Sequence, residues 1–275
     1  MSGGPPGPHA FPGTGPAFAA VPTRASYATR AASTSARCSS AQATSVTAAS
    51  RSVAPIGVSA YSTRGGITGY MVRLTIPSTP QFTNTPGQVA LSPSGTQLIV
   101  TTKANGNDID VFGVGPGGRL SASPVVNAEG STVPFAIAFD QAGHLVIANA
   151  GTNALSTFTL GSDGTVTLID SAGTGQAATC WVARAGGTLY ASNAGSANVS
   201  GYTSSGSGQL TLLGQTSTDP GTVDATAAQD GAFLYVQTGG NGIVDEFSAG
   251  TGGSLTSVGS VTVAGAAGGE GIAAS

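Results

Sequence analysis

Two carboxylates, Asp224 and Glu270, are the side chains of this 275-residue chain that are best suited to acid–base chemistry. Each follows a glycine-containing turn and opens a short run of apolar and small residues. Two carboxylates that converge on one substrate can accept and donate its protons. The alternative is a non-catalytic role, in which both are solvated loop carboxylates or accept hydrogen bonds from backbone N–H groups. The choice between these interpretations depends on the elements that position them.

Residues for nucleophilic, metal or cofactor chemistry are scarce. The chain has two histidines, His9 and His144, and it lacks the Gly-x-Ser-x-Gly motif. Cys180 lies beside Trp181 in an apolar run, which favours a small core residue over a nucleophile. The segment 113–118 matches Gly-x-Gly-x-x-Gly, but it contains a proline and opens no helix, as a dinucleotide site would require. The sequence therefore predicts no metal site and no cofactor.

The composition indicates an all-β protein with many turns. The chain contains 43 glycines, 40% hydrophobic residues and 8% charged residues, whereas soluble domains average about 25% charged residues. Glycine at this density disfavours long helices, because it costs about 1 kcal/mol relative to alanine in a helix interior. A net charge of -3 offers no basic surface for nucleic acid. No apolar run approaches the roughly 18 to 20 residues of a membrane-spanning helix, so neither nucleic acid nor a membrane is an expected partner.

Residues 1–56 differ in composition from the rest of the chain. The first 70 residues contain five arginines and no acidic residue, whereas all 12 acidic residues follow. Residues 1–56 also lack a periodic apolar pattern, so they cannot bury enough apolar surface to compensate for the entropy lost on folding. We expect a disordered or non-native leader over 1–56. The alternative is an organellar transit peptide, which shares this composition. No signal peptide is visible.

A repeat of about 45 residues organises the remainder of the chain. An aromatic residue recurs at Phe112, Phe158, Tyr202 and Phe247, and a Gly-x-[Leu/Val]-[Thr/Ser] pattern recurs with the same spacings. Each unit contains four short strand-like runs between glycine-rich turns, which is the pattern of a β-propeller blade. The predicted propeller covers 57–275, with repeats near 86–121, 134–167, 178–211 and 222–256 and partial ones at 57–75 and 269–275.

The segments 145–153 and 189–198 resemble the YVTN-type repeat. With the Gly-x-Leu-Thr pattern, they make the chain similar to the lactonase-type propellers, which include bacterial 6-phosphogluconolactonases and fungal carboxymuconate cyclases. The resemblance implies a seven-bladed family fold, of which this chain carries about five blades' worth and is truncated at its N-terminus. It further implies hydrolysis of a lactone, a lactone or carbohydrate-derived ligand, and an extracellular or periplasmic location. The His and Arg used by the fungal members have no assignable counterpart here. The alternative function is a non-catalytic extracellular binding or scaffolding propeller.

One face of such a propeller carries the starts of the innermost strands and the loops between second and third strands. We therefore predict Asp224 and Glu270 as catalytic residues. Four further residues on this face are the predicted ligand-binding residues: Gln88, Asn149, Trp181 and Asn193. The repeated asparagines have a structural alternative, because asparagine tolerates positive φ and closes tight turns. Five blades' worth of repeats would also leave blade edges uncovered, which predicts self-association.

Overall fold

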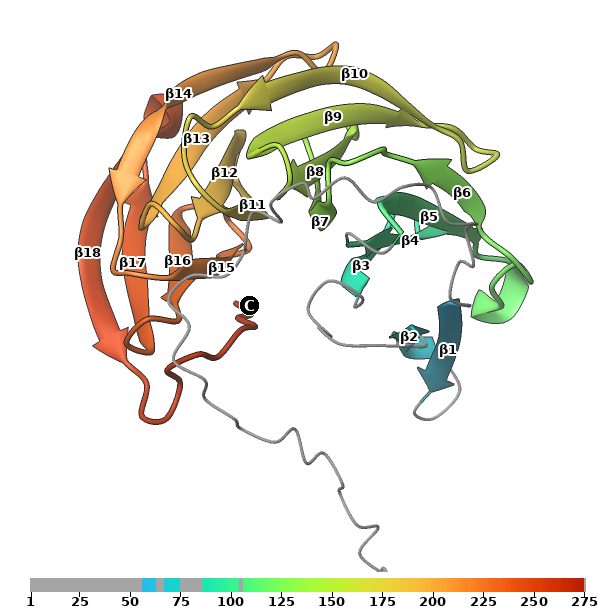
Figure 1. Cartoon of the computed structure of the whole chain (residues 1–275), viewed down its shortest axis with the longest axis horizontal. Helices are drawn as coiled ribbons and strands as arrows, with labels where there is room; N and C mark the ends of the chain where they lie inside the picture. Colours follow the sequence, from blue (N-terminus) through green and yellow to red (C-terminus); the bar gives the residue numbers. More distant parts are fainter. Residues whose placement is uncertain (1–55, 63–66, 75–85, 104–105, 275) are drawn as a thin grey trace, which may run out of the picture. The chain divides into compact units, whose positions relative to one another are not determined.

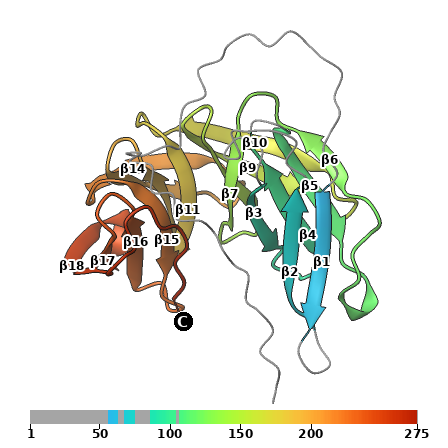
Figure 2. The same ribbon diagram turned by 60° about the horizontal axis from the view of Figure 1, so that its bottom comes forward.

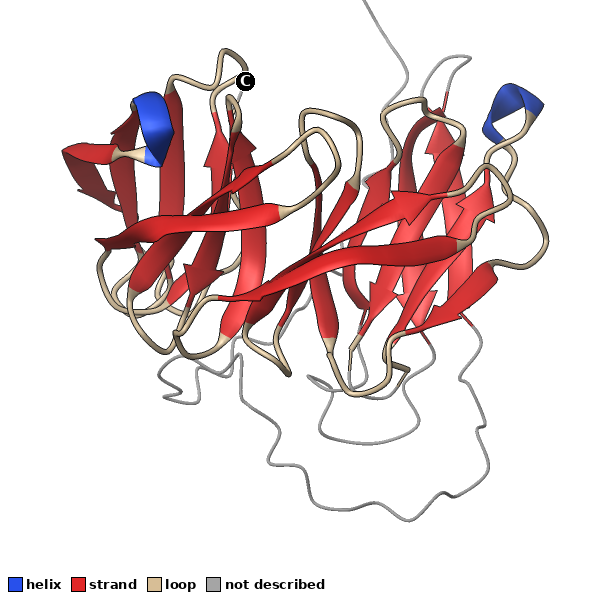
Figure 3. Cartoon of the chain, turned by 90° about the horizontal axis from the view of Figure 1, so that it is seen from above, coloured by secondary structure: helices blue, strands red, loops and turns tan. Residues whose placement is uncertain are grey.

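The computed structural model describes residues 56–62, 67–74, 86–103 and 106–274. The leader predicted over 1–56 falls almost entirely outside these residues. Within them the regular structure consists of strands, apart from two single 3₁₀ turns at Pro116–Gly118 and Thr251–Gly253 (Figure 3). No helix in this part of the chain has the length and hydrophobicity to cross a membrane. The all-β class predicted from the sequence is confirmed.

Strands β3 to β18 form four antiparallel sheets of four strands each, and each of these sheets is one propeller blade. Blade 1 contains β3 (Pro86–Leu91), β4 (Gln97–Thr102), β5 (Asp108–Gly113) and β6 (Val125–Ala128). Blade 2 contains β7 (Pro134–Phe139), β8 (Leu145–Asn149), β9 (Ala154–Leu160) and β10 (Val166–Gly173). Blade 3 contains β11 (Thr179–Ala185), β12 (Thr188–Asn193), β13 (Asn198–Ser204) and β14 (Leu210–Ser217). Blade 4 contains β15 (Thr222–Ala227), β16 (Phe233–Thr238), β17 (Ile243–Ala249) and β18 (Leu255–Thr262).

The blades pack through their innermost strands. Strand β7 packs against β3 and β11, and β11 packs against β15. These four strands lie on the inner side of their blades, and the fourth strand of each blade lies outermost (Figures 1 and 2). Among the described strands, β1 (Ile56–Ser62) and β2 (Ile67–Leu74) pair only with each other. The predicted four-stranded blade architecture is therefore present in four complete blades.

The hydrophobic core lies between successive blades. Every residue of β8 is buried, because blades 1 and 3 cover its two faces. Leu145 and Ile147 join the cluster shared with blade 1, whereas Val146 and Ala148 join the cluster shared with blade 3. Since side chains alternate across a strand, a strand covered on both faces reads as one continuous apolar run.

In blades 2, 3 and 4 the repeated aromatic residue packs the third strand against the preceding blade. Phe158 lies in the cluster between blades 1 and 2, Tyr202 in that between blades 2 and 3, and Phe247 in that between blades 3 and 4. The Tyr202 hydroxyl also donates to the Gly173 carbonyl of blade 2 at 2.9 Å. The aromatic period in the sequence is thus the period of the blade contacts.

The repeated glycine is required both by its backbone angle and by the closeness of the preceding blade. Gly164 and Gly208, in the hairpins between third and fourth strands, have φ values of 89° and 84°. A Cβ atom at Gly208 would lie 2.8 Å from Ile169 Cδ1, and one at Gly164 would lie 3.0 Å from Val125 Cγ2. Both neighbours belong to the preceding blade. The pattern therefore marks a close approach that other residues would disturb.

The C-terminal segment corrects one expectation. The sequence pattern predicted a partial blade repeat at 269–275, but 264–274 form turns and irregular structure and no strand. No further strand lies beside this segment in the described part of the chain, so its backbone groups bond to blade 4 and to themselves. Gly268 N–H donates to the Gly239 carbonyl, and Ile272 N–H donates to the Asp224 carboxylate.

Candidate functional site

Every blade begins with the same distortion of its innermost strand. The register between first and second strands shifts just after Pro86, Pro134, Thr179 and Thr222. Such a β-bulge redirects the adjacent side chains and is frequent beside active sites. In blades 2, 3 and 4 the preceding residue has positive φ: Val133 at 54°, Ala178 at 57° and Gly221 at 84°. Valine and alanine rarely adopt this conformation, so the blades hold the strand starts in a strained arrangement, as functional sites often do.

The bulged strand starts line a cavity of about 360 Å³, which is within the range of small-molecule sites. The cavity is lined by Pro86, Gly87, Lys103, Phe135, Cys180, Trp181, Val223, Asp224, Glu270 and Gly271. Both predicted catalytic carboxylates and the predicted ligand-binding Trp181 therefore lie in one cavity. A second hollow of about 420 Å³ lies beside Arg119, and none of the described residues that line it is a carboxylate, so they offer no acid–base pair.

Asp224 is a buried carboxylate in the wall of this cavity, with an exposed fraction of 3%. Its Oδ1 accepts a hydrogen bond from Ala225 N–H at 2.7 Å, and its Oδ2 accepts one from Ile272 N–H at 3.2 Å. Burial raises the pKa of Asp224 to about 6; backbone hydrogen bonds oppose the rise and the Glu270 carboxylate adds to it. A carboxylate with this pKa is ionised at neutral pH and is an effective proton acceptor.

Lys103 is the residue of the site that the sequence interpretation missed. It follows β4 directly, is 8% exposed, and places its Nζ 4.2 Å from the centroid of the Phe135 ring. Burial lowers the pKa of Lys103 to about 8, and the Glu270 carboxylate partly opposes this fall. The signal was present in the sequence, because this is the single lysine of the chain. The corresponding residues after β8 and β12 are Ala150 and Ala194.

Two aromatic side chains form one wall of the cavity. Trp181 and Phe135 meet edge to face, with ring centroids 6.3 Å apart and an interplanar angle of 68°. Trp181 is half-buried and packs against the apolar clusters on both sides of blade 3. This packing fixes the indole while part of it stays exposed to the cavity, as expected of a platform for a ligand ring.

The other predicted ligand-binding residues do not line the cavity. The Gln88 side-chain carbonyl accepts a hydrogen bond from Ile137 N–H at 2.5 Å and so links blade 1 to blade 2. Asn149 and Asn193 are buried, and their amides donate to serine hydroxyls on the adjacent strands at 2.8 and 2.9 Å. The structure therefore brings Trp181 together with the carboxylates and places these three residues within the blades.

Two further asparagines show what the loops between second and third strands require. Asn107 and Asn153 have φ values of 56° and 49°. Their side-chain oxygens accept hydrogen bonds from Val133 N–H at 3.2 Å and from Thr179 N–H at 3.0 Å. Each asparagine therefore closes its own turn and also holds the start of the next blade's innermost strand. The structural explanation of the repeated asparagines accounts for both positions.

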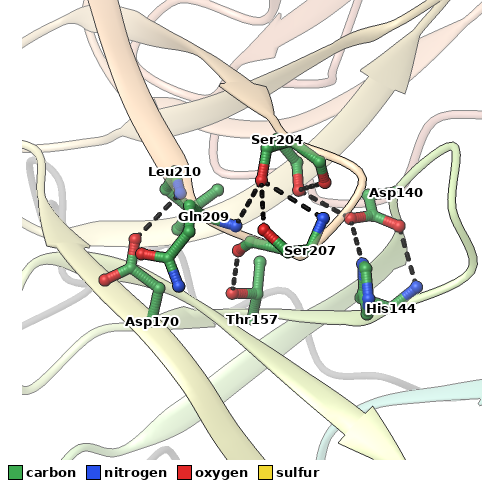
Figure 4. Close-up of polar contacts among 10 residues, drawn as sticks. Asp140, His144, Thr157, Asp170, Ser204, Ser207, Gln209 and Leu210 are labelled. Carbon is green, nitrogen blue, oxygen red and sulfur yellow. Dashed lines mark hydrogen bonds and ion pairs between the residues drawn. The ribbon is translucent and has the colours of Figure 1, made fainter.

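His144 lies in the β7–β8 turn beside Asp140 (Figure 4), and it is not one of the residues that line the cavity. Its Nδ1 is 2.8 Å from Asp140 Oδ2, and the Ser204 hydroxyl donates to the same oxygen at 2.6 Å. Because serine bonds to the aspartate and not to the imidazole, the three residues lack the order of a nucleophilic triad. Within the described ranges, no three His, Cys, Asp or Glu side chains are placed to hold a metal ion.

Comparison with known proteins shows which solved structures share this fold. No family model matches the sequence, and no curated protein matches it significantly. A Bacteroides fragilis protein named as a candidate 6-phosphogluconolactonase is 19% identical, with a TM-score of 0.58 over 70% of this chain and 60% of its own. The periplasmic gluconolactonase of Pseudomonas aeruginosa is 19% identical, with a TM-score of 0.54 over 64% of this chain and 53% of its own.

These similarities and the four blades define the class: the chain has the lactonase-type β-propeller fold. The match spans less than two thirds of the length of either structure. At such low identity the structural similarity establishes the fold alone. One fold of this kind can carry many different chemistries. The function must therefore be argued from the cavity.

Proposed function

We propose that this protein hydrolyses a lactone in the cavity at the blade starts, with Asp224 as the general base and Lys103 as the stabiliser of the oxyanion. The observation that carries the proposal is that a buried carboxylate and a buried ammonium group share one small-molecule-sized cavity with an aromatic wall. The lactonase-type fold supports the same reaction class.

The reaction needs one water and no cofactor. The Asp224 carboxylate accepts a proton from water as the water oxygen forms a bond to the lactone carbonyl carbon. Negative charge then develops on the carbonyl oxygen, where the Lys103 ammonium stabilises it. The carbonyl re-forms as the ring C–O bond breaks, and the leaving ring oxygen takes the proton from Asp224. Asp224 is thereby returned to its ionised form, and the product is a hydroxy acid.

Glu270 has a supporting role in this scheme. It is exposed on the cavity wall and acts on the charges of both other groups. Its carboxylate favours the ammonium form of Lys103, which counters the loss of charge caused by burial. The sequence-based prediction of Glu270 as a second acid–base group thus becomes, in this proposal, a residue that keeps Lys103 charged near neutral pH.

The test is hydrolysis of D-glucono-1,5-lactone by the full chain, corrected for the spontaneous reaction. Asp224→Asn should lower kcat/KM by about 10²- to 10⁴-fold, since it removes a general base. Lys103→Met should lower it by about 10²- to 10³-fold, since it removes one oxyanion-stabilising group. Asp230→Asn, an exposed change in the same blade, is the matched control, and circular dichroism checks that all variants fold.

Two results would overturn the proposal. One is unchanged activity in both cavity variants, which would place the reaction elsewhere. The other is failure to hydrolyse any of a panel of five- and six-membered lactones. Binding of an intact lactone without turnover would instead favour the non-catalytic binding propeller, the alternative function for this fold.

A further inference from the structure

The cavity wall carries more acidic than basic side chains, and this limits the charge of the substrate that it can bind. Among the lining residues Lys103 is the single cation, whereas Asp224 and Glu270 are both acidic. The Lys103 ammonium is already engaged by the Phe135 ring and by the field of Glu270. The remaining lining residues are glycine, proline, cysteine, valine and aromatic residues, whose side chains offer no positive charge.

Binding of a phosphate group has different requirements. A phosphate monoester carries about -1.5 to -2 charges at pH 7. Proteins recognise it with arginine forks, lysines, helix N-termini or clusters of free backbone N–H groups. In the described part of this cavity no arginine lines the wall, and the backbone N–H groups of Ala225 and Ile272 already donate to Asp224. Glu270 would meet such a ligand with a like charge.

Glu270 is held at the wall by its neighbour in the chain. Ile272 N–H bonds to Asp224 Oδ2, and Gly269 N–H bonds to the Ala266 carbonyl, so both sides of Glu270 are tied down. These bonds hold the backbone of Glu270 beside the cavity, so its exposed carboxylate stays at the wall even though the segment forms no strand. A fixed charge at an opening discriminates between charged and neutral ligands more by repulsion than by contact.

We propose that the cavity takes an uncharged polyhydroxylated lactone and rejects its phosphorylated counterpart, with Glu270 as the specificity-determining residue. The exposed part of Trp181 would pack against the apolar face of the sugar ring, which carries no charge in this substrate class. This inference rests on the proposed function.

The experiment compares D-glucono-1,5-lactone with its 6-phosphate at pH 7.5. We expect kcat/KM to favour the uncharged lactone by at least about 10-fold. Glu270→Gln should reduce this preference about 3- to 10-fold, and Glu270→Lys should reduce it further. The preference of the unaltered protein should also weaken between 20 and 500 mM salt, because salt screens charge repulsion. Glu246→Gln removes the same charge elsewhere in blade 4 and should leave the ratio unchanged.

The inference fails if the phosphorylated lactone is the better substrate, or if Glu270→Gln changes the ratio no more than Glu246→Gln does. If neither of these two lactones nor any lactone of the panel is hydrolysed, the proposed function has failed and the inference is tested by binding. Fluorescence of Trp181, the single tryptophan of the chain, then reports titrations with D-glucose and D-glucose 6-phosphate. Tighter binding of glucose supports the inference, whereas equal or tighter binding of the phosphate, or no binding of either, overturns it.

Discussion

Blades 2 and 3 are joined by a buried carboxylate whose contribution to stability can be measured. Asp140, which is 6% exposed, follows β7 and receives three hydrogen bonds. Two come from His144, through its backbone N–H and its Nδ1, each at 2.8 Å. The third comes from the Ser204 hydroxyl of blade 3 at 2.6 Å, and it is the one that crosses between the blades (Figure 4).

Ser204→Ala removes this inter-blade bond and leaves the carboxylate with the two bonds from His144. A hydrogen bond to a charged group contributes about 1.5 to 3 kcal/mol. A loss of 1 kcal/mol lowers the Tm of a domain of 150 to 250 residues by about 2 to 4 °C. We therefore expect Ser204→Ala to lower the free energy of unfolding by about 1.5 to 3 kcal/mol, and the Tm by about 3 to 12 °C.

The pH dependence provides a second readout. Burial raises the pKa of Asp140, but the hydrogen bonds from Ser204 and His144 outweigh burial and hold the pKa below its ordinary value of 3.8. A carboxylate with a lowered folded-state pKa stabilises the fold above its ordinary pKa, and this stabilisation is lost as the pH falls through the folded-state value. The Tm difference between the unaltered protein and Asp140→Asn should be full at pH 6 and should shrink below about pH 4.

Thermal unfolding followed by circular dichroism at pH 3, 4 and 6 measures both effects. Ser207→Ala, in the same hairpin of blade 3 and bonded only to an exposed serine hydroxyl, is the control and should melt with the unaltered protein. A Ser204→Ala variant that melts within about 1 °C of the unaltered protein would refute this reasoning. A Tm difference for Asp140→Asn that is equal at pH 3 and pH 6 would also refute it.

Three other predictions follow from the charges and edges of the blades. If Asp224 and Lys103 act as proposed, kcat/KM should rise through pH 6 as Asp224 ionises and fall above pH 8 as Lys103 loses its proton; a flat profile between pH 5 and 9 would contradict both roles. Burial and the nearby Asp108 raise the pKa of Asp110 to about 7, and its Oδ1 has no hydrogen-bond partner. The charge of ionised Asp110 therefore destabilises the fold as the pH rises from 4 to 7. Urea unfolding should show that Asp110→Asn is more stable than the unaltered protein by about 1 to 3 kcal/mol at pH 8 but not at pH 4. Strand β18 exposes Val258 and Val261, so sedimentation should show concentration-dependent self-association that Val258→Lys weakens.

The blade architecture was predictable because its two sequence marks report contacts between blades that recur in blades 2, 3 and 4. The aromatic mark at Phe158 and Tyr202 packs each blade on the one before it. The glycine mark at Gly164 and Gly208 needs both a positive φ and room for the neighbouring blade. The C-terminal segment was mispredicted because Gly-Ile-Ala-Ala resembles a strand in composition. A strand also needs a partner, and local sequence does not report whether one is present.

The candidate site was predictable only in part. Asp224 and Trp181 were found because they occupy corresponding positions just after the bulge in β15 and β11. Gln88 holds the same position in β3, but its side chain bonds to the backbone of blade 2 instead of lining the cavity. Position in the repeat therefore predicts which backbone faces the cavity, whereas the direction of each side chain depends on contacts from another blade.

Lys103 shows where the chemistry of a repeat protein is best sought. The residue that follows the second strand is Ala150 in blade 2, Ala194 in blade 3 and Gly239 in blade 4. Small residues suit this position because the start of the next blade lies close by: Ala150 and Ala194 share one cluster with Cys180 of blade 3 and Val223 of blade 4. A lysine there must be accommodated by burial against an aromatic ring, and burial lowers its pKa. The residues that the blades share maintain the fold. A buried lysine at a position where the other blades have alanine or glycine is unfavourable for the fold, so it points to a role that the fold itself does not require.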